Sequence, residues 1–429
     1  MKLQSLWQVR TGRDGVLSRR AFLGVAGAGA AGACLGWKDA VALHAAELRK
    51  EGRACILLFM RGGPSQFETF DPKPGATTGG PTKGIDTAVS GIQIAENWPN
   101  VAKVADNIAF IRSMNNREGE HLRASYQLHT GYAPSGAVKY PSIGSVVASE
   151  LGPKDFDLPH YVSVGGGFGT VGSGFLGMSV APFVVNNPEQ VPNNVALPGI
   201  AANRFERRVG LLKDLETDFA SAGGGPRVAA HQDLYKNAAR MVLSPRLDAF
   251  NLASETDAVR DAYGRNGFGQ GCLLARRLVE RGVTFVEVGM NGWDTHQDNF
   301  NRTKTLSTTV DKAMASLITE LKERGRLDKT LIIWMGEFGR TPRINGNTGR
   351  DHYPRAFNVA LAGGGIKGGR VIGKTSDSGS EVKERPVSVN DLFCSLYQAL
   401  GINAGKENMS GLGRPIKIVD GGKAVSELF

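Results

Sequence analysis

The sequence has few cysteines, no basic run and no long apolar span, and each shortage excludes a class of protein. The four cysteines contain no CxxC pair, so neither a disulfide framework nor a cysteine metal site is expected. The formal charge of +10 is spread along the chain, which argues against nucleic-acid binding. The uncharged apolar stretch at residues 21–36 is shorter than the ~20 residues of a membrane helix. No stable transmembrane span is therefore expected.

That apolar stretch has instead the form of an export signal. Arg19 and Arg20 stand just before it, and it contains six alanines and five glycines. A charged segment followed by a weakly apolar one is typical of the twin-arginine (Tat) route, and Ala40 and Ala42 fit a small-x-small cleavage site. We expect residues 1–42 to be a signal peptide recognised by the twin-arginine translocase. The mature protein would then be periplasmic or extracellular, and lipidation at Cys34 remains an open alternative.

Removing this segment leaves a charge of about +6, because it carries six basic and two acidic residues. A moderate positive charge without a basic run favours an anionic small molecule or carbohydrate as the substrate over a nucleic acid. The three remaining cysteines lie in apolar runs and are expected to be buried thiols.

The rest of the chain alternates short apolar runs with helical patterns. The runs predict buried strands at residues 55–60, 108–111, 161–164, 284–288, 330–334 and 357–361. Between two of them, residues 310, 314, 317, 318 and 321 are apolar at helical spacing. Strand, amphipathic helix, strand indicates an α/β fold with a mostly parallel central sheet, and no linker divides residues 43–429 into two domains. Residues 204–281 are mostly helical in pattern, with Leu211 and Leu215 on one stripe.

Two glycine patterns match GxGxxG, at residues 167–172 and 363–368. Neither opens a helix, so the helix dipole that binds a pyrophosphate is missing and nucleotide binding is not expected.

Polar residues that could carry chemistry form three motifs after two of the apolar runs. Asp294 and His296 come after the strand at 284–288, Glu337 and Arg340 come after the next strand, and His352 lies a short distance beyond. Loops at the carboxyl ends of parallel strands line the ligand crevice of open α/β sheets. Aspartate and histidine together suit zinc or a harder divalent ion. Taken singly, each motif could equally be a helix cap, a turn or a surface ion pair.

An earlier segment adds further candidates, His121, Arg123, Ser125 and His129. Ser125 could be a nucleophile, but no GxSxG elbow surrounds it. The same residues also fit an ordinary polar helix start.

Several longer motifs resemble the family catalogued as domain of unknown function 1501 (DUF1501). They are RGGPSQ at 61–66, FDPKP at 70–74, GWDTH at 292–296, GEFGRTP at 336–342, GRDHYP at 349–354 and GRPI at 413–416. The resemblance covers nearly all of the mature chain. It implies the alkaline-phosphatase-like and sulfatase fold group, an α/β/α sandwich that often carries a two-metal hydrolytic site.

Within that group the resemblance implies that Asp294, His296 and His352 hold a divalent metal, zinc or calcium/magnesium, with Glu337 or His121 completing the site. Arg340 or Arg123 would hold the anionic group of the substrate. The sequence departs from the group's pattern in two places. Arg61 and Gly62 stand where a metal-binding acid is expected, and His121 occupies the position of the sulfatase nucleophile.

These features lead to one function and one alternative. The first is an exported, metal-dependent hydrolase of phosphate or sulfate esters, which uses an activated water because the usual nucleophile is missing. The alternative is a non-catalytic member of the same fold that binds polysaccharide or a partner protein.

Overall fold

A computed structural model describes residues 51–429 apart from 166–169, 193–194, 196–201, 220 and 222–224. The expected signal peptide, Cys34 and residues 167–169 of the first GxGxxG pattern lie outside the described residues. Within the described part of the chain, no helix is both long and apolar enough to cross a membrane.

An eight-stranded sheet forms the centre of the molecule. Its strands, in spatial order, are β12 (Arg370–Ile372), β4 (Ile108–Met114), β11 (Phe357–Ala362), β8 (Thr330–Met335), β1 (Ala54–Met60), β7 (Phe285–Met290), β5 (Tyr161–Val164) and β6 (Phe183–Val185). All neighbours pair in parallel except β11, which is antiparallel to both β4 and β8. The mostly parallel sheet and all six predicted strands are confirmed.

The antiparallel direction of β11 follows from its connection to β8. The chain leaves the carboxyl end of β8, forms the two-stranded ribbon of β9 (Gly339–Arg340) and β10 (His352–Tyr353), and enters β11 from the same edge. It therefore runs back beside β8 without the crossover that a parallel strand needs.

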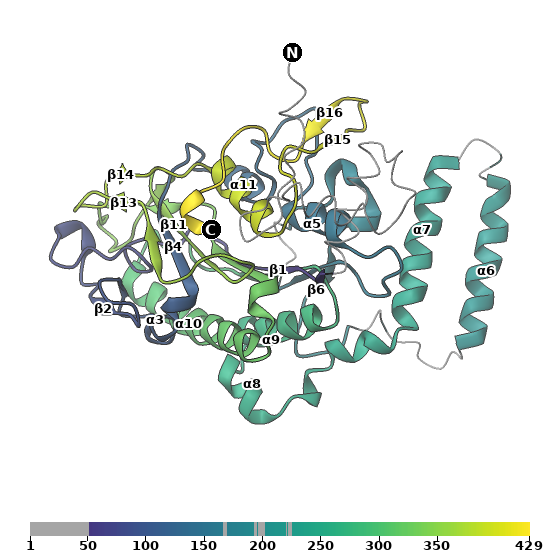
Figure 1. Ribbon diagram of the computed structural model, residues 1–429, viewed down its shortest axis with the longest axis horizontal. Helices are drawn as coiled ribbons and strands as arrows, with labels where there is room; N and C mark the ends of the chain where they lie inside the picture. Colours follow the sequence, from purple (N-terminus) through teal and green to yellow (C-terminus); the bar gives the residue numbers. More distant parts are fainter. Residues whose placement is uncertain (1–50, 166–169, 193–194, 196–201, 220, 222–224) are drawn as a thin grey trace, which may run out of the picture.

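Helices cover both faces of the sheet (Figure 1). One face packs against α3 (Pro99–Lys103), α8 (Asp257–Tyr263), α9 (Gly267–Glu280) and α10 (Asn299–Glu323), and the other against α4 (His121–Thr130), α5 (Ile143–Leu151) and α11 (Val389–Ala399). Side chains of β1 alternate between the two cores: Ile56 and Leu58 enter the first, Cys55 and Leu57 the second. This period of two buries both faces of a central strand. The predicted α/β/α sandwich is confirmed.

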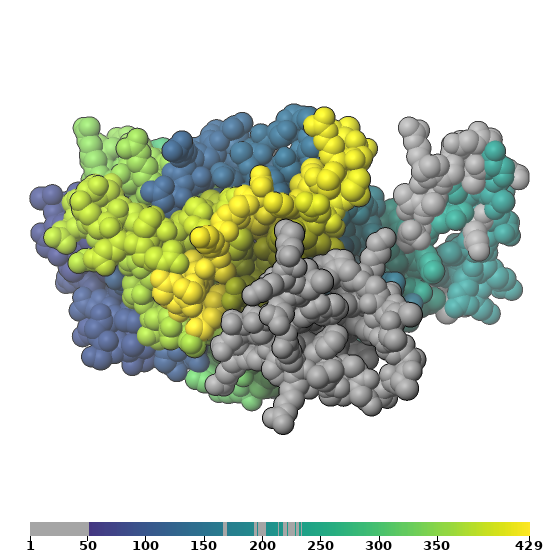
Figure 2. Space-filling model, turned by 45° about the horizontal axis from the view of Figure 1, so that its top comes forward, coloured from purple at the N-terminus to yellow at the C-terminus, as the bar shows by residue number. Residues whose placement is uncertain are grey.

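A helix pair stands away from the sheet at one end of the molecule. It consists of α6 (Ala202–Phe219) and α7 (Gly225–Val242), and Figure 2 shows the same teal end standing apart from the body in a second view. The predicted helicity is confirmed, but Leu211 and Leu215 are 61% and 67% exposed. Cys55 and Cys272 are buried as expected, whereas Cys394 is half-buried.

Candidate functional site

The candidate site lies where three neighbouring parallel strands end. β8, β1 and β7 run side by side, so their carboxyl ends share one edge of the sheet. Arg61 and Gly62 follow β1, Asp294 and His296 follow β7, and Glu337 follows β8. The loop after β7 approaches Gly62 so closely that a Cβ there would lie 2.3 Å from the backbone nitrogen of Asp294. Only glycine fits this contact, and its φ of 114° also favours glycine.

Two other elements complete the site. Helix α4 begins at His121, because the Glu120 side chain accepts hydrogen bonds from the backbone N–H groups of Leu122 and Arg123. Strand β10 presents His352, which pairs with Arg340 of β9. Five separate segments therefore meet at this edge, which no single motif could have revealed.

Three histidines and one aspartate converge there. Nε2 of His121 lies 3.3 Å from Oδ2 of Asp294, and Nε2 of His352 lies 3.3 Å from Oδ1. Nε2 of His296 lies 3.1 Å from Oδ1 of Asp294 and 3.0 Å from Nε2 of His352. One ligand atom each from His121, Asp294 and His352 lie within 4.8 Å of one another.

Each of the three imidazole rings is held from behind by its other nitrogen. Nδ1 of His121 donates to Oε1 of Glu337 at 2.7 Å, and Nδ1 of His296 donates to Oδ1 of Asp351 at 2.8 Å. Nδ1 of His352 donates to the carbonyl oxygen of Gly119 at 2.8 Å. A metal-binding histidine usually donates its second ring N–H to a carboxylate or carbonyl in this way, which turns the lone pair of Nε2 towards the metal.

The short distance between the Nε2 atoms of His296 and His352 is favourable only if a cation or a proton lies near them. Partial burial lowers the pKa of His352, as do the charges of Arg340 and His121, so that its ring is neutral near pH 7. With Nδ1 as the donor, its Nε2 carries a lone pair directed at the Nε2 of His296, 3.0 Å away. Two lone pairs at that distance repel each other unless a cation or a proton lies between or beside them.

Asp294 is kept ionised by a buried arginine. Nη2 of Arg340 donates to Oδ1 of Asp294 at 2.5 Å. Partial burial raises the pKa of Asp294, but the hydrogen bond and positive charge of Arg340 outweigh burial and bring the pKa to about 2. The carboxylate is therefore available as a ligand at neutral pH.

The donor set fits a metal ion. A tetrahedral site with bonds of 2.0–2.1 Å places its ligand atoms about 3.3 Å apart. The separations of Asp294 from the three rings are close to this value, with His121 facing Oδ2 and the other two rings facing Oδ1. Two buried atoms also lack a hydrogen-bond partner among the described residues, Nε2 of His121 and Oε2 of Glu337. The group of His121, Asp294 and His352 can therefore hold a metal, with His296 beside it.

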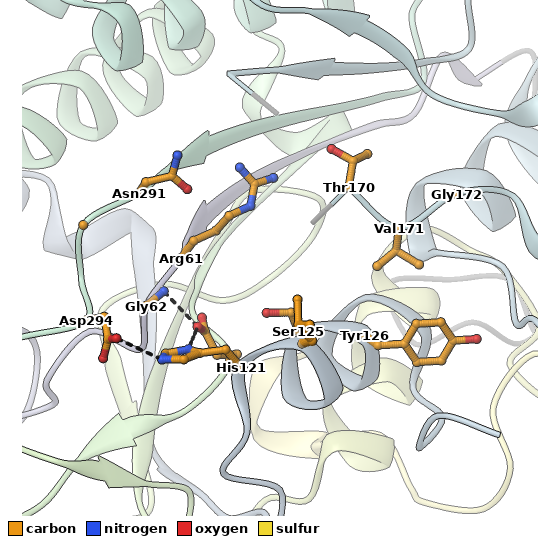
Figure 3. A pocket seen from close by; sticks show the side chains of 13 residues that line it. Arg61, Gly62, His121, Ser125, Tyr126, Thr170, Val171, Gly172, Asn291 and Asp294 are labelled. Carbon is orange, nitrogen blue, oxygen red and sulfur yellow. Dashed lines mark hydrogen bonds and ion pairs between the residues drawn. The ribbon is translucent and has the colours of Figure 1, made fainter. Parts of the chain in front are cut away.

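A pocket of about 500 Å³ opens in front of this cluster (Figure 3). Its described lining residues are Arg61, Gly62, His121, Leu122, Ser125, Tyr126, Thr170, Val171, Gly172, Asn291, Gly292, Asp294 and Glu337. The pocket therefore gives a small molecule access to His121 and Asp294 of the cluster.

The site residues expected from the sequence have different roles in the structure. His121 joins the cluster, and Glu337 stands behind it as a hydrogen-bond acceptor. Arg340 is fully buried, and its three nitrogens donate to carbonyl oxygens and to Asp294, so it positions the aspartate and cannot also hold an anion. Arg123 is exposed, pairs with Glu118 and does not line the pocket. Ser125 does line it.

Neither acid that follows β1 replaces the missing metal-binding carboxylate. Glu68 pairs with Arg350 in the interior at 2.9 Å, and Asp71 bonds to Lys73 and Thr375. Sequence reasoning missed two residues of the site, Asp351 and Arg61. The signals were present, since Asp351 precedes His352 and Arg61 directly follows a strand.

The fold and site define an α/β/α protein with a histidine and aspartate cluster at the carboxyl edge of its sheet. The chain belongs to the family described as "Protein of unknown function (DUF1501)", whose sequence profile matches residues 52–429. A search of curated proteins found no match.

Several solved structures are similar at a distance. A sulfatase from Pseudoalteromonas sp. is 14% identical over 85% of this chain and 71% of that chain, with a TM-score of 0.38. A protein in the alkaline phosphatase superfamily from Vibrio parahaemolyticus is 10% identical over 84% and 74%, with a TM-score of 0.37. A phosphonate monoester hydrolase of Agrobacterium radiobacter is 12% identical over 88% and 77%, with a TM-score of 0.34. These likenesses are too distant to assign an activity.

Proposed function

We propose that the protein is a metal-dependent hydrolase of phosphate or sulfate esters that works outside the cytoplasm. The observation that carries the proposal is the convergence of three imidazole Nε2 atoms on Asp294, each ring fixed through Nδ1. This arrangement suits a metal, because Nδ1 of each ring is bound to an acceptor and Nε2 is left to face the carboxylate of Asp294.

The proposed ion is zinc. Imidazole nitrogen suits zinc and other transition metals, whereas calcium and magnesium prefer sites made wholly of oxygen. His121, Asp294 and His352 would be the ligands, and His296, 3.1 Å from the same carboxylate, would be the fourth.

The ion and the residues around it would have separate roles in hydrolysis. When bound, the ion would polarise the ester oxygen and acidify a water molecule. Glu337 and Asp351 fix the tautomers of His121 and His296, while Arg340 keeps Asp294 ionised. The pocket in front of the cluster receives the ester, an anionic small molecule or an anionic carbohydrate. Because His121 stands where sulfatases carry a nucleophile, water is the proposed attacking group.

Export by the twin-arginine translocase belongs to the same proposal. It rests on Arg19 and Arg20 and on the short apolar segment after them. That route carries folded proteins, which suits an enzyme that acquires its metal before export.

Elemental analysis of the purified protein tests the proposal. We expect one zinc per chain in the parent, loss of the metal in His352→Ala, and retention in His231→Ala, which removes a histidine paired with Glu216 outside the site. Hydrolysis of aryl phosphates and aryl sulfates should follow the metal content. A metal-free protein that hydrolyses no ester but binds an anionic polysaccharide column would support the non-catalytic alternative instead.

A further inference from the structure

The pocket has a second polar end, formed by Arg61. Figure 3 shows its guanidinium near Asn291 and Thr170, on the far side of Gly62 from His121. We propose that Arg61 is the anion-binding residue of the pocket and that it binds a tetrahedral oxyanion, a sulfate or phosphate group of the substrate. This inference deepens the proposed function by assigning the residue that recognises the anionic substrate.

Arg61 reaches this position because β7 has a glycine beside it. The side chain leaves the end of β1 and lies across the neighbouring strand at Gly289. A Cβ at Gly289 would lie 2.3 Å from Nη1 of Arg61 and 2.8 Å from its Cζ. The missing side chain of residue 289 therefore makes the space that the guanidinium occupies.

A buried carboxylate fixes the guanidinium from behind. Glu287 is fully buried, and its Oε1 accepts from Nη2 of Arg61 at 2.8 Å. Its Oε2 accepts from the hydroxyl of Tyr161 at 2.8 Å, and Nε2 of His129 lies 3.6 Å from Oε1. A charged side chain held by such a network loses little conformational freedom when a ligand binds.

Other donors of the same guanidinium are left for a ligand. Nε is buried and has no hydrogen-bond partner among the described residues, and Nη1 reaches only the carbonyl oxygen of Gly165, at 3.4 Å. The long contact of Nη1 with Gly165 leaves that nitrogen weakly bonded, and an oxyanion in the pocket would give it a stronger acceptor. The planar fork of arginine matches the oxygens of sulfate and phosphate.

No second arginine or lysine competes for the anion in the described part of the pocket. Among its described lining residues, Arg61 is the only one of these two types. Arg340 has its donors bound to backbone oxygens and Asp294, and Arg123 lies outside. The oxyanion could be the ester that reacts at the cluster or a second anionic group of the same substrate, and the experiment separates these sources.

Binding of inorganic sulfate and phosphate, measured by calorimetry on the purified protein before and after chelation, tests the proposal. Arg61→Gln should weaken the anion affinity by about tenfold or more, because hydrogen bonds to charged groups exceed the free energy of a tenfold change. Arg123→Gln is the matched control and should leave the affinity unchanged.

Two further variants distinguish a loss of anion binding from a loss of the fold. Arg61→Gln leaves Glu287 without its ion-pair partner, so the double variant Arg61→Gln/Glu287→Gln should be folded and equally weak in anion binding. Gly289→Ala keeps the charge but displaces the guanidinium, and should weaken binding several-fold with unchanged metal content. Failure of the parent to bind either anion, or affinity retained in the double variant, would overturn the proposal. If the protein contains no metal but its anion binding depends on Arg61, the assignment of Arg61 stands and only the metal mechanism is refuted.

The source of the oxyanion follows from kinetics. If it is the reacting ester, Arg61→Gln should raise KM for an aryl monosulfate or monophosphate. If it is a second group, KM should rise only for a disulfated saccharide or another doubly charged ester. Unchanged KM for both substrate types would contradict a role for Arg61 in substrate binding.

Discussion

Oε1 of Glu337 accepts two hydrogen bonds, from Nδ1 of His121 at 2.7 Å and from the backbone N–H of Gly62 at 2.8 Å. The carboxylate thus ties the first residue of α4 to the end of β1. The bond to Glu337 also raises the pKa of His121. Glu337 is therefore a positioning residue that determines where the Nε2 of His121 points.

Replacing this carboxylate should weaken metal binding without unfolding the protein. In Glu337→Gln the ring of His121 loses its charged acceptor, and metal affinity should fall about 10–100-fold, as for other partners of metal-binding histidines. Competition with a chromogenic chelator measures the change. Glu118→Gln, which removes a carboxylate paired with Arg123 near the surface, should have no effect. Equal affinity in the two variants would show that Glu337 does not position His121.

The buried pair of Arg61 and Glu287 should make stability depend on pH. Burial raises the pKa of Glu287, but His129, Arg61 and Tyr161 together bring it to about 2. The unfolded carboxyl titrates near ~4.3, so the stabilisation, about 3 kcal/mol, is complete above that pH and disappears as the pH falls towards 2. Urea unfolding should show Glu287→Gln less stable than the parent at pH 7, with the difference narrowing between pH 5 and pH 3. A difference that stays constant with pH would contradict this ionic contribution.

The sheet was largely predictable because buried strands are continuous apolar runs. The run at residues 357–361 gave the position of β11 but not its direction, since an apolar strand has the same pattern in both directions. The same limit applies to Leu211 and Leu215, whose helical spacing says nothing of whether another element covers them. Only tertiary packing decides both questions.

The site was predictable where its residues follow strands of one sheet. Asp294, His296 and Glu337 meet that condition, and His352 was a candidate because it lies in a polar motif a short distance beyond them. The roles of Arg340 and Arg61 depend on distances in the folded structure, which the spacing of residues in the sequence does not predict. Arg340 donates to backbone carbonyl oxygens and to Asp294. Arg61 is held in the pocket by the space beside Gly289 and by its ion pair with Glu287, which engages only Nη2.

Export is open to a direct test. Changing Arg19 and Arg20 together to lysine keeps the charge but removes both guanidinium groups, which the twin-arginine receptor is expected to distinguish from ammonium groups. The precursor should then accumulate in the cytoplasm, as measured by cell fractionation and immunoblotting. Lysine substitution at Arg10 and Arg13 is the matched control and should leave export intact. Normal export of the Arg19 and Arg20 variant would rule out the twin-arginine route.

The last prediction separates an activated water from a serine nucleophile, since both His296 and Ser125 lie at the site. His296→Ala removes a ring whose Nε2 is 3.1 Å from Asp294, and should reduce bound metal and abolish ester hydrolysis. The fold should persist, because the side chain of His296 is 44% exposed and contributes little to the core. Ser125→Ala should keep turnover within a few-fold of the parent, whereas loss of a true nucleophile costs several orders of magnitude. Steady-state kinetics with an aryl phosphate and an aryl sulfate measures both variants. Activity that survives His296→Ala and chelation but disappears in Ser125→Ala would replace the metal mechanism with a serine mechanism.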